Sequence, residues 1–202
     1  MKGASPLQPA NLTCEYINNP LGIDTRAPRL SWNFTSTENN QWQTAYEIIV
    51  SDNLVDLQQS KGNSWTTGKI LSWQNLHINY GGQPLQSFTK YYWRVKVFNG
   101  KGEASEWSDA AWFETAMLEP SDWSAQWISD GTIRPANEED YYKDDRMPLF
   151  RKVFSVGKKI ISARLYISGL GYYEAYLNGQ KIGDHVLDPG FTTYAKQTLY
   201  VV

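Results

Sequence analysis

Only two side chains in the 202-residue chain could serve as an imidazole base, His77 and His185. They lie far apart in the sequence, and neither belongs to a motif typical of a nucleophilic triad. His185 lies between Asp184 and Asp188, so it could be a base oriented by a carboxylate or simply the histidine of a surface turn. We favour the surface turn, and we interpret His77, which precedes Ile78, as a strand residue.

Metal ligands are scarce outside one acidic segment. The single cysteine, Cys14, and the two histidines are too few for a structural zinc site, which needs four thiolate or imidazole ligands. Residues 131–146 could be read as a calcium loop, but residues 141–143 (YYK) interrupt the carboxylates and no D-x-D-x-D-G pattern is present. We interpret this run as a solvated loop and expect no metal. Its acidic residues are Glu138, Glu139, Asp140, Asp144 and Asp145.

Neither cofactor binding nor glycoside cleavage can be assigned to particular residues. Residues 169–171 (GLG) lack the third glycine of a dinucleotide-binding loop and the Lys-Ser/Thr pair of a P-loop. A glycosidase needs two carboxyl groups about 5 to 10 Å apart, and 21 acidic residues supply many candidate pairs of which none stands out. We therefore predict no catalytic and no cofactor-binding residue in this chain.

The charge balance argues against polyanionic partners. Nineteen basic and 21 acidic residues give a net charge of -2, which offers no broad attraction to nucleic acid or to an anionic membrane. No stretch approaches the roughly 20 apolar residues of a membrane span. Residues 1–6 (MKGASP) lack the apolar segment of a secretory signal. Two locations stay open: the cytoplasm and, as we favour, the periplasm or the cell exterior after removal of a signal.

Alternating apolar and polar residues, interrupted by Gly, Asn and Asp turns, predict an all-β protein. Strands are expected over residues 30–34 and 45–50, and one helical turn within residues 52–59. Aromatic residues make up 14% of the chain. We interpret most of them as core rather than as ligand platforms, because large rings fill a sandwich core efficiently.

The most informative segment begins at Leu85. Residues 91–97 alternate as a half-buried strand, residues 99–102 (NGKG) predict a hairpin, and residues 111–115 return as its partner. Tyr91 follows Leu85 by six residues, a spacing that resembles the tyrosine corner of fibronectin type III modules. In that corner the phenol hydroxyl bonds to upstream backbone.

These signals predict a fibronectin type III-like or immunoglobulin-like antiparallel sandwich over residues 8–117. Residues 119–122 (EPSD) break the alternation with a proline that cannot join a central ladder, so we place a boundary there. A second β-sandwich is expected over residues 118–202. Its expected strands are residues 123–128, 150–156, 162–169 and 172–177.

Two features define the end of this second module. Asn178 and Gly179 predict a tight hairpin that joins residues 172–177 to residues 180–183. Residues 199–202 (LYVV) form a strand-like run with no closing strand after it. Because an unpaired strand edge leaves backbone groups without partners, we expect the second sandwich to be incomplete.

Six short segments, in a fixed order along nearly the whole chain, carry a resemblance to a known family. They are residues 19–24 (NPLGID), 28–32 (PRLSW), 92–95 (YWRV), 123–128 (WSAQWI), 169–179 (GLGYYEAYLNG) and 183–190 (GDHVLDPG). Together they resemble the N-terminal region of bacterial α-L-rhamnosidases of glycoside hydrolase family 78. The later segments resemble the N-terminal β-sandwich module of that family.

The resemblance implies an enzyme with several β-sandwiches followed by an (α/α)6 barrel, in which carboxylates remove terminal α-L-rhamnose with inversion. No residue of this chain matches the family's general acid or base. The expected function is therefore that of a non-catalytic accessory portion. The expected partners are the missing downstream catalytic domain and, through the parent enzyme, a rhamnose-containing glycan or glycoside.

Two other functions stay open. An independent carbohydrate-binding module would stack sugars on exposed rings, and the candidates are Trp123, Trp127, Tyr172 and Tyr173. Their alternating context favours core packing over sugar binding. A cell-surface interaction module is supported only by the fibronectin-like features, which occur in proteins of many functions.

Overall fold

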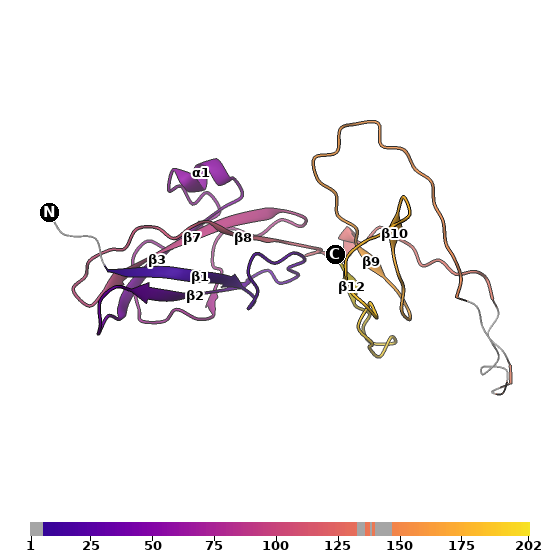
Figure 1. The fold of residues 1–202 in the computed structure, drawn as a ribbon, viewed down its shortest axis with the longest axis horizontal. Helices are drawn as coiled ribbons and strands as arrows, with labels where there is room; N and C mark the ends of the chain where they lie inside the picture. Colours follow the sequence, from indigo (N-terminus) through magenta and orange to yellow (C-terminus); the bar gives the residue numbers. More distant parts are fainter. Residues whose placement is uncertain (1–5, 133–135, 138, 140–146) are drawn as a thin grey trace.

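The larger sheet is organised by β7 (Lys90–Asn99), the longest strand of the chain (Figure 1). In the computed structural model, which describes residues 6–132, 136, 137, 139 and 147–202, β7 pairs with β3 (Gln43–Ser51) on one side and β8 (Ala111–Glu114) on the other. The short strands β4 (Trp65–Thr66) and β5 (Ile70–Leu71) pair with β3. All these pairings are antiparallel.

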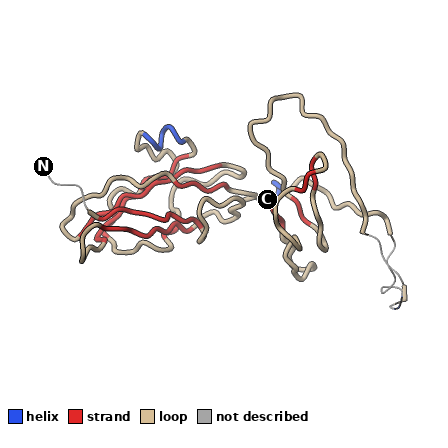
Figure 2. The backbone as a smooth tube through the Cα atoms, viewed as in Figure 1, coloured by secondary structure: helices blue, strands red, loops and turns tan. Residues whose placement is uncertain are grey.

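A second sheet has the order β1-β2-β6 and consists of β1 (Leu7–Cys14), β2 (Arg29–Ser36) and β6 (Ile78–Asn79). The one α-helix among the described residues, α1 (Leu54–Gln58), lies within the predicted helical turn. Its N-cap is Asn53, whose side-chain oxygen accepts hydrogen bonds from the first turn of the helix. Strands dominate this part of the chain, as Figure 2 shows.

The two sheets share one hydrophobic core. Along β7, Tyr91, Trp93, Val95 and Val97 are buried and alternate with half-buried residues on the other face. Trp32 of the second sheet belongs to the same cluster. The predicted all-β immunoglobulin-like sandwich is confirmed, because a period of two places large apolar side chains on one face only.

The predicted tyrosine corner is confirmed. The hydroxyl oxygen of Tyr91 accepts a hydrogen bond from the backbone N–H of Gln86 at 2.8 Å, and the Tyr91 residue is only 4% exposed. Thr115 fastens the same loop, because its hydroxyl donates to the Gln86 carbonyl oxygen at 2.6 Å. The loop before β7 is thus held to the end of β8.

The second part of the chain, beyond residue 118, contains little regular structure (Figure 1). It begins with a 3-10 turn, η1 (Pro120–Asp122). The hairpin of β10 (Tyr176–Leu177) and β11 (Gln180–Lys181) has the predicted turn, and its strands are shorter than the predicted residues 172–177 and 180–183. Asn178 and Gly179 form its turn with φ of 51° and 81°, the positive values that such a two-residue turn requires.

The terminal strand-like run is paired in part. Its strand, β12 (Tyr200–Val201), is antiparallel to β9 (Ile167–Ser168). The expectation of an edge without partners is therefore wrong on the side that faces β9. The boundary placed between residues 117 and 118 stays a prediction.

Two predicted strands are absent and two are shorter than predicted. Residues 123–128 and 150–156 have no strand structure. Only Ile167–Ser168 of the segment 162–169 and only Tyr176–Leu177 of the segment 172–177 form strands. No backbone hydrogen bond joins residues 147–165 to any other described residue. An alternating pattern becomes a strand only next to another strand, and without one its apolar residues stay exposed, as Phe154 and Val156 do at 64% and 54%. The second sandwich is incomplete within the described residues.

Two further expectations concern metals and membranes. Of the acidic run, Glu139 is exposed, whereas Glu138, Asp140, Asp144 and Asp145 lie outside the described residues. In the part of the chain that the structure describes, no three His, Cys, Asp or Glu side chains are grouped so that they could hold a metal ion. Within the same residues, no helix has the length and apolar character needed to cross a bilayer.

Replacing Tyr91 by Phe should lower the free energy of unfolding by about 1–2 kcal/mol, because the hydrogen bond from the N–H of Gln86 to the Tyr91 hydroxyl is lost. Chemical denaturation measures the change. The matched control is Tyr92→Phe, since the Tyr92 hydroxyl has no hydrogen-bond partner among the described residues and its loss should cost less than 0.5 kcal/mol, roughly. Equal effects of the two substitutions would contradict the corner.

Candidate functional site

The second part of the chain is fastened to the sandwich by an ion pair. The Glu114 carboxylate, whose side chain is 11% exposed, accepts hydrogen bonds from Nε of Arg164 at 2.8 Å and from Nη2 at 2.9 Å. Lys90 Nζ lies 3.9 Å from the same carboxylate. A two-pronged guanidinium contact of this kind fixes orientation as well as charge. We call this ion pair, together with the ring contacts of Phe88, Tyr166, Tyr200 and Trp123 described next, the seam.

Aromatic rings continue the seam in a row. The ring of Phe88 packs edge-on against that of Tyr166 with centres 5.1 Å apart, and Tyr166 lies 6.3 Å from Tyr200. Tyr200 in turn lies 6.1 Å from Trp123. Burial raises the pKa of Tyr166 and of Tyr200, so both phenols are neutral at physiological pH. These rings therefore form a continuous uncharged contact between the sandwich and the second part of the chain.

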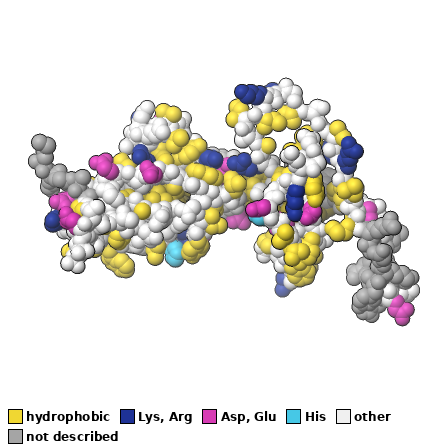
Figure 3. All heavy atoms as spheres, viewed as in Figure 1, with side chains coloured by type: hydrophobic (Ala, Val, Ile, Leu, Met, Phe, Trp, Pro, Cys, Tyr) yellow, Lys and Arg dark blue, Asp and Glu magenta, His cyan; other side chains and the backbone are white. Residues whose placement is uncertain are grey.

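A cleft with a volume of about 390 Å³ opens beside this row of aromatic rings. It is lined by Met117, Leu118, Glu119, Pro120, Trp123, Trp127, Ser168, Thr198 and Tyr200. The volume falls within the ~300–1,000 Å³ typical of small-molecule sites. Trp127 is 61% exposed, although tryptophan is one of the costliest side chains to leave in water. Hydrophobic side chains are also visible on the surface of the second part in Figure 3.

The structure brings together two of the four rings named from the sequence. Trp123 and Trp127 line the cleft, whereas Tyr172 and Tyr173 do not. Tyr172 is 54% exposed elsewhere, and the backbone of Tyr173 is bound to the Asp188 carbonyl at 2.9 Å. Sequence reasoning missed the contribution of Tyr200, for which the only signal was its place in the terminal strand-like run.

Carboxylates next to the cleft are held by neighbouring groups. Asp122 accepts hydrogen bonds from the hydroxyl of Ser87 and from the backbone N–H groups of Leu118 and Glu119. These contacts, that of Ser87 foremost, lower the pKa of Asp122. The Glu119 carboxylate is paired with Arg26 at 2.6 Å and remains about half exposed. Glu119 is therefore a charged group at the rim that a ligand could reach.

Neither histidine forms a catalytic arrangement. His185 is 63% exposed, with Nδ1 3.2 Å from an oxygen of Asp188, and no hydroxyl or thiol of the described residues is bonded to it. This agrees with the surface-turn interpretation. The interpretation of His77 as a strand residue is wrong, because it lies just before β6 with a φ of 56°. Its exposed ring packs edge-on against Tyr16 instead.

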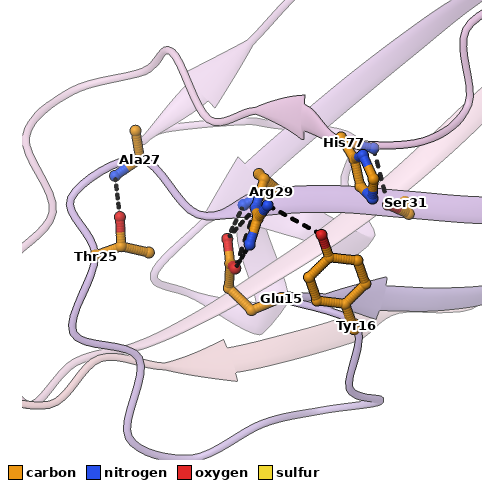
Figure 4. A network of polar contacts seen from close by, with 7 residues as sticks. All are labelled: Glu15, Tyr16, Thr25, Ala27, Arg29, Ser31 and His77. Atoms are coloured by element: carbon orange, nitrogen blue, oxygen red, sulfur yellow. Dashed lines mark hydrogen bonds and ion pairs between the residues drawn. The ribbon is translucent and has the colours of Figure 1, made fainter.

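A polar cluster around Arg29 secures the turn between β1 and β2 (Figure 4). The Arg29 guanidinium donates to both oxygens of Glu15, with the shortest contact 2.6 Å, and to the hydroxyl of Tyr16 at 3.0 Å. The hydrogen bond from Arg29 is the main cause that lowers the pKa of Glu15. His77 is bound through its backbone N–H to the Ser31 hydroxyl. We interpret this cluster as structural.

The lone thiol has no chemical role in this structure. Cys14 is 1% exposed, and burial together with the adjacent Glu15 carboxylate raises its pKa to about 12. A thiolate is the reactive form of cysteine, and almost none forms at neutral pH under these conditions. The cleft at the seam therefore remains the candidate functional site.

Comparisons with known proteins agree with the architecture. Residues 9–119 match the family model described as "Rha78A-like, N-terminal immunoglobulin domain". The chain belongs to this family. Residues 158–202 match a second model, "Alpha-L-rhamnosidase N-terminal domain". The resemblance to the N-terminal region of α-L-rhamnosidases is thereby confirmed for this Rha78A-like chain.

Curated proteins named α-L-rhamnosidase match most of this chain. An α-L-rhamnosidase of Formosa agariphila is 35% identical over 198 residues, which span 91% of this chain and 21% of that protein. An α-L-rhamnosidase of Streptomyces avermitilis is 39% identical over 125 residues, or 62% of this chain and 12% of the relative. The chain thus spans about a fifth or less of the length of these relatives.

Solved structures of α-L-rhamnosidases also match this chain over a small part of their own length. The α-L-rhamnosidase of Dictyoglumus thermophilum matches 99% of this chain and 23% of its own with a TM-score of 0.86 at 38% identity. That of Aspergillus terreus matches 96% of this chain and 21% of its own, with a TM-score of 0.73 at 30% identity. The Streptomyces avermitilis enzyme complexed with L-rhamnose matches 61% of this chain and 12% of its own, with a TM-score of 0.58 at 38% identity.

Replacing Arg164 by Ala should loosen the second part of the chain, because Glu114 then loses its two-pronged partner. We expect chymotrypsin to cleave within residues 167–202 several-fold faster while the sandwich resists. The control is Arg151→Ala, since Arg151 is exposed and has no ion-pair partner among the described residues. An unchanged cleavage rate for Arg164→Ala would contradict a holding role for the ion pair.

The Glu15–Arg29 pair should make stability depend on pH. The folded pKa of Glu15 lies below its unfolded value of about 4.3, so its stabilisation is full above that value and is lost as pH falls through the folded pKa. Glu15→Gln should cost up to about 1 kcal/mol at pH 7. Denaturation from pH 7 to pH 2 should show the two proteins converging in acid. A difference that is independent of pH would contradict this assignment.

Proposed function

We propose that the chain is a non-catalytic N-terminal portion of an α-L-rhamnosidase, and that polypeptide outside these 202 residues carries the glycosidic chemistry. The proposal is supported by the similarity over 91% to 99% of the chain to proteins of that name, of which the chain spans 21% to 23%. A parent enzyme of this kind would act on terminal α-L-rhamnose in a glycan or glycoside.

The described carboxyl groups whose pKa is shifted add support to the non-catalytic role, which rests chiefly on the chain spanning only 21% to 23% of its relatives. A glycosidase needs a general acid, a carboxyl group whose pKa is raised so that it is protonated near neutral pH. Every carboxyl pKa shift found among the described residues is downward, and hydrogen bonding is the leading cause each time. The groups concerned are Glu15, Asp122, Asp130 and Glu174.

The exposed residues between 147 and 165 support an accessory role within a larger protein. Phe150, Phe154 and Val156 are 49%, 64% and 54% exposed, and they lie on one face of the alternating segment 150–156. Side chains of this kind gain free energy by burial against another apolar surface. We expect polypeptide of the parent enzyme to pack against them. The periplasmic or extracellular location stays a prediction.

The purified 202-residue chain should release no rhamnose from an aryl α-L-rhamnoside, whereas a longer protein that carries this chain should do so. Colorimetric release of the aryl group measures both. Turnover by the 202-residue chain that disappears in Glu119→Gln or Asp122→Asn, with circular dichroism unchanged, would overturn the proposal.

A further inference from the structure

We propose that the loop after β1 presents a docking surface for the polypeptide that follows Val202 in the parent enzyme. The surface consists of Tyr16, Ile17 and Leu21, and we call it the turn surface. The identity of the partner rests on the proposed function. The surface itself rests on the geometry of the turn, on the exposure of its apolar side chains and on the position of Val202.

Residues 15–16 (EY) form a two-residue turn whose sequence does not suit its geometry. Cys14 and Ile17, on either side of the turn, exchange two backbone hydrogen bonds of 2.9 and 3.0 Å. The two residues between them have φ of 47° and 70°, values that glycine and asparagine adopt far more readily than other residues. The hairpin turn at residues 178–179 (NG) also has positive φ at both positions and carries the residues that favour it. The side chains of residues 15–16 are therefore not explained by the turn alone.

Contacts with Arg29 hold this strained turn in place (Figure 4). The guanidinium donates to both oxygens of Glu15 and to the Tyr16 hydroxyl, and it lies 4.8 Å from the centre of the Tyr16 ring. The ring of His77 packs edge-on against the same ring, with centres 5.2 Å apart. Even so, Tyr16 is 63% exposed and Ile17 is 59% exposed. Two large side chains are thus held in a fixed position at the surface, where they would lose little conformational entropy on docking.

The rest of the loop is fastened to β8, which leaves Leu21 at the surface. The backbone N–H of Glu114 donates to the Pro20 carbonyl oxygen at 3.0 Å, and that of Ile23 donates to the Glu114 carbonyl oxygen at 3.0 Å. The N–H of Ala116 donates to the Ile23 carbonyl oxygen at 2.7 Å. Leu21, between these contacts, is 43% exposed. Apolar side chains that their own module leaves in water gain free energy when another apolar surface covers them.

The position of Val202 identifies the partner. Its Cγ2 lies 3.2 Å from where a Cβ atom on Gly22 would be, so the end of the chain reaches the loop that carries the turn surface. In Figure 1 the C-terminus lies where the sandwich meets the second part of the chain. Gly22 follows Ile17 by five residues, so the two are at most about 18 Å apart, a distance that about six extended residues span. Polypeptide joined to Val202 therefore starts within reach of the whole turn surface.

The small size of the turn surface favours a contact within one polypeptide over a contact between separate proteins. A fully buried aromatic side chain covers roughly 150–250 Å², and these three side chains are only partly exposed. A stable interface between separate proteins buries roughly 1,000 Å² or more, which three such side chains do not supply. A segment of the same polypeptide has a high effective concentration, so a small surface is enough to hold it.

Photo-crosslinking in a longer protein that carries this chain tests the identity of the partner. The substitution Ile17→p-benzoylphenylalanine should give crosslinks to residues that directly follow Val202, identified by mass spectrometry. The matched control is the same substitution at Val55 of α1. Val55 is 59% exposed, as Ile17 is, and α1 lies on the other side of the sandwich from the loop after β1 (Figure 1). The control should give no crosslink to that segment.

Thermal unfolding tests whether residue 17 becomes buried. Ile17→Asn should lower the melting temperature of the longer protein by several degrees and leave that of the 202-residue chain nearly unchanged, because only the longer protein covers the turn surface. Val55→Asn should have the same small effect in both proteins.

The proposal is overturned if Ile17→Asn shifts both melting temperatures equally. It is also overturned if position 17 gives no crosslink, or crosslinks only to a second copy or to a part of the parent enzyme other than the segment after Val202. Rhamnose release plays no part in either readout. An active longer protein that failed both tests would therefore leave the proposed function standing.

Discussion

The register of β7 is the constraint on which the rest of the structure depends. It sets Tyr91 and Trp93 into the core and pairs Lys90 with Glu114 at the end of β8. That pairing places a nearly buried carboxylate at the one point where Arg164 reaches it. A shift of one residue would turn the core face outward and move the carboxylate away. The seam, and the cleft beside it, therefore follow from the packing of the sandwich.

The features that could be predicted from sequence depend on a few neighbouring residues. The corner of Tyr91, the turn at Asn178 and the short helix α1 each rest on local backbone preferences and were found where expected. Residues 150–156 show the limit of this reasoning. Their alternation is a property of sequence, but a strand forms only when a neighbour completes its hydrogen bonds, and the described residues supply none.

The candidate site was predictable only in part for the same reason. Trp123 and Trp127 stood out as closely spaced rings just after the predicted boundary, and both line the cleft. The pairing of Arg164 with Glu114 spans 50 residues and leaves no local signal in the sequence.

Hydrogen–deuterium exchange of the intact chain tests most directly whether order decreases outward from β7 across the seam. The account predicts the strongest amide protection in β3 and β7, intermediate protection in β9 and β12, and exchange close to that of unstructured peptide in residues 147–165, where backbone partners are absent among the described residues. Protection of residues 147–165 equal to that of β7 would contradict it.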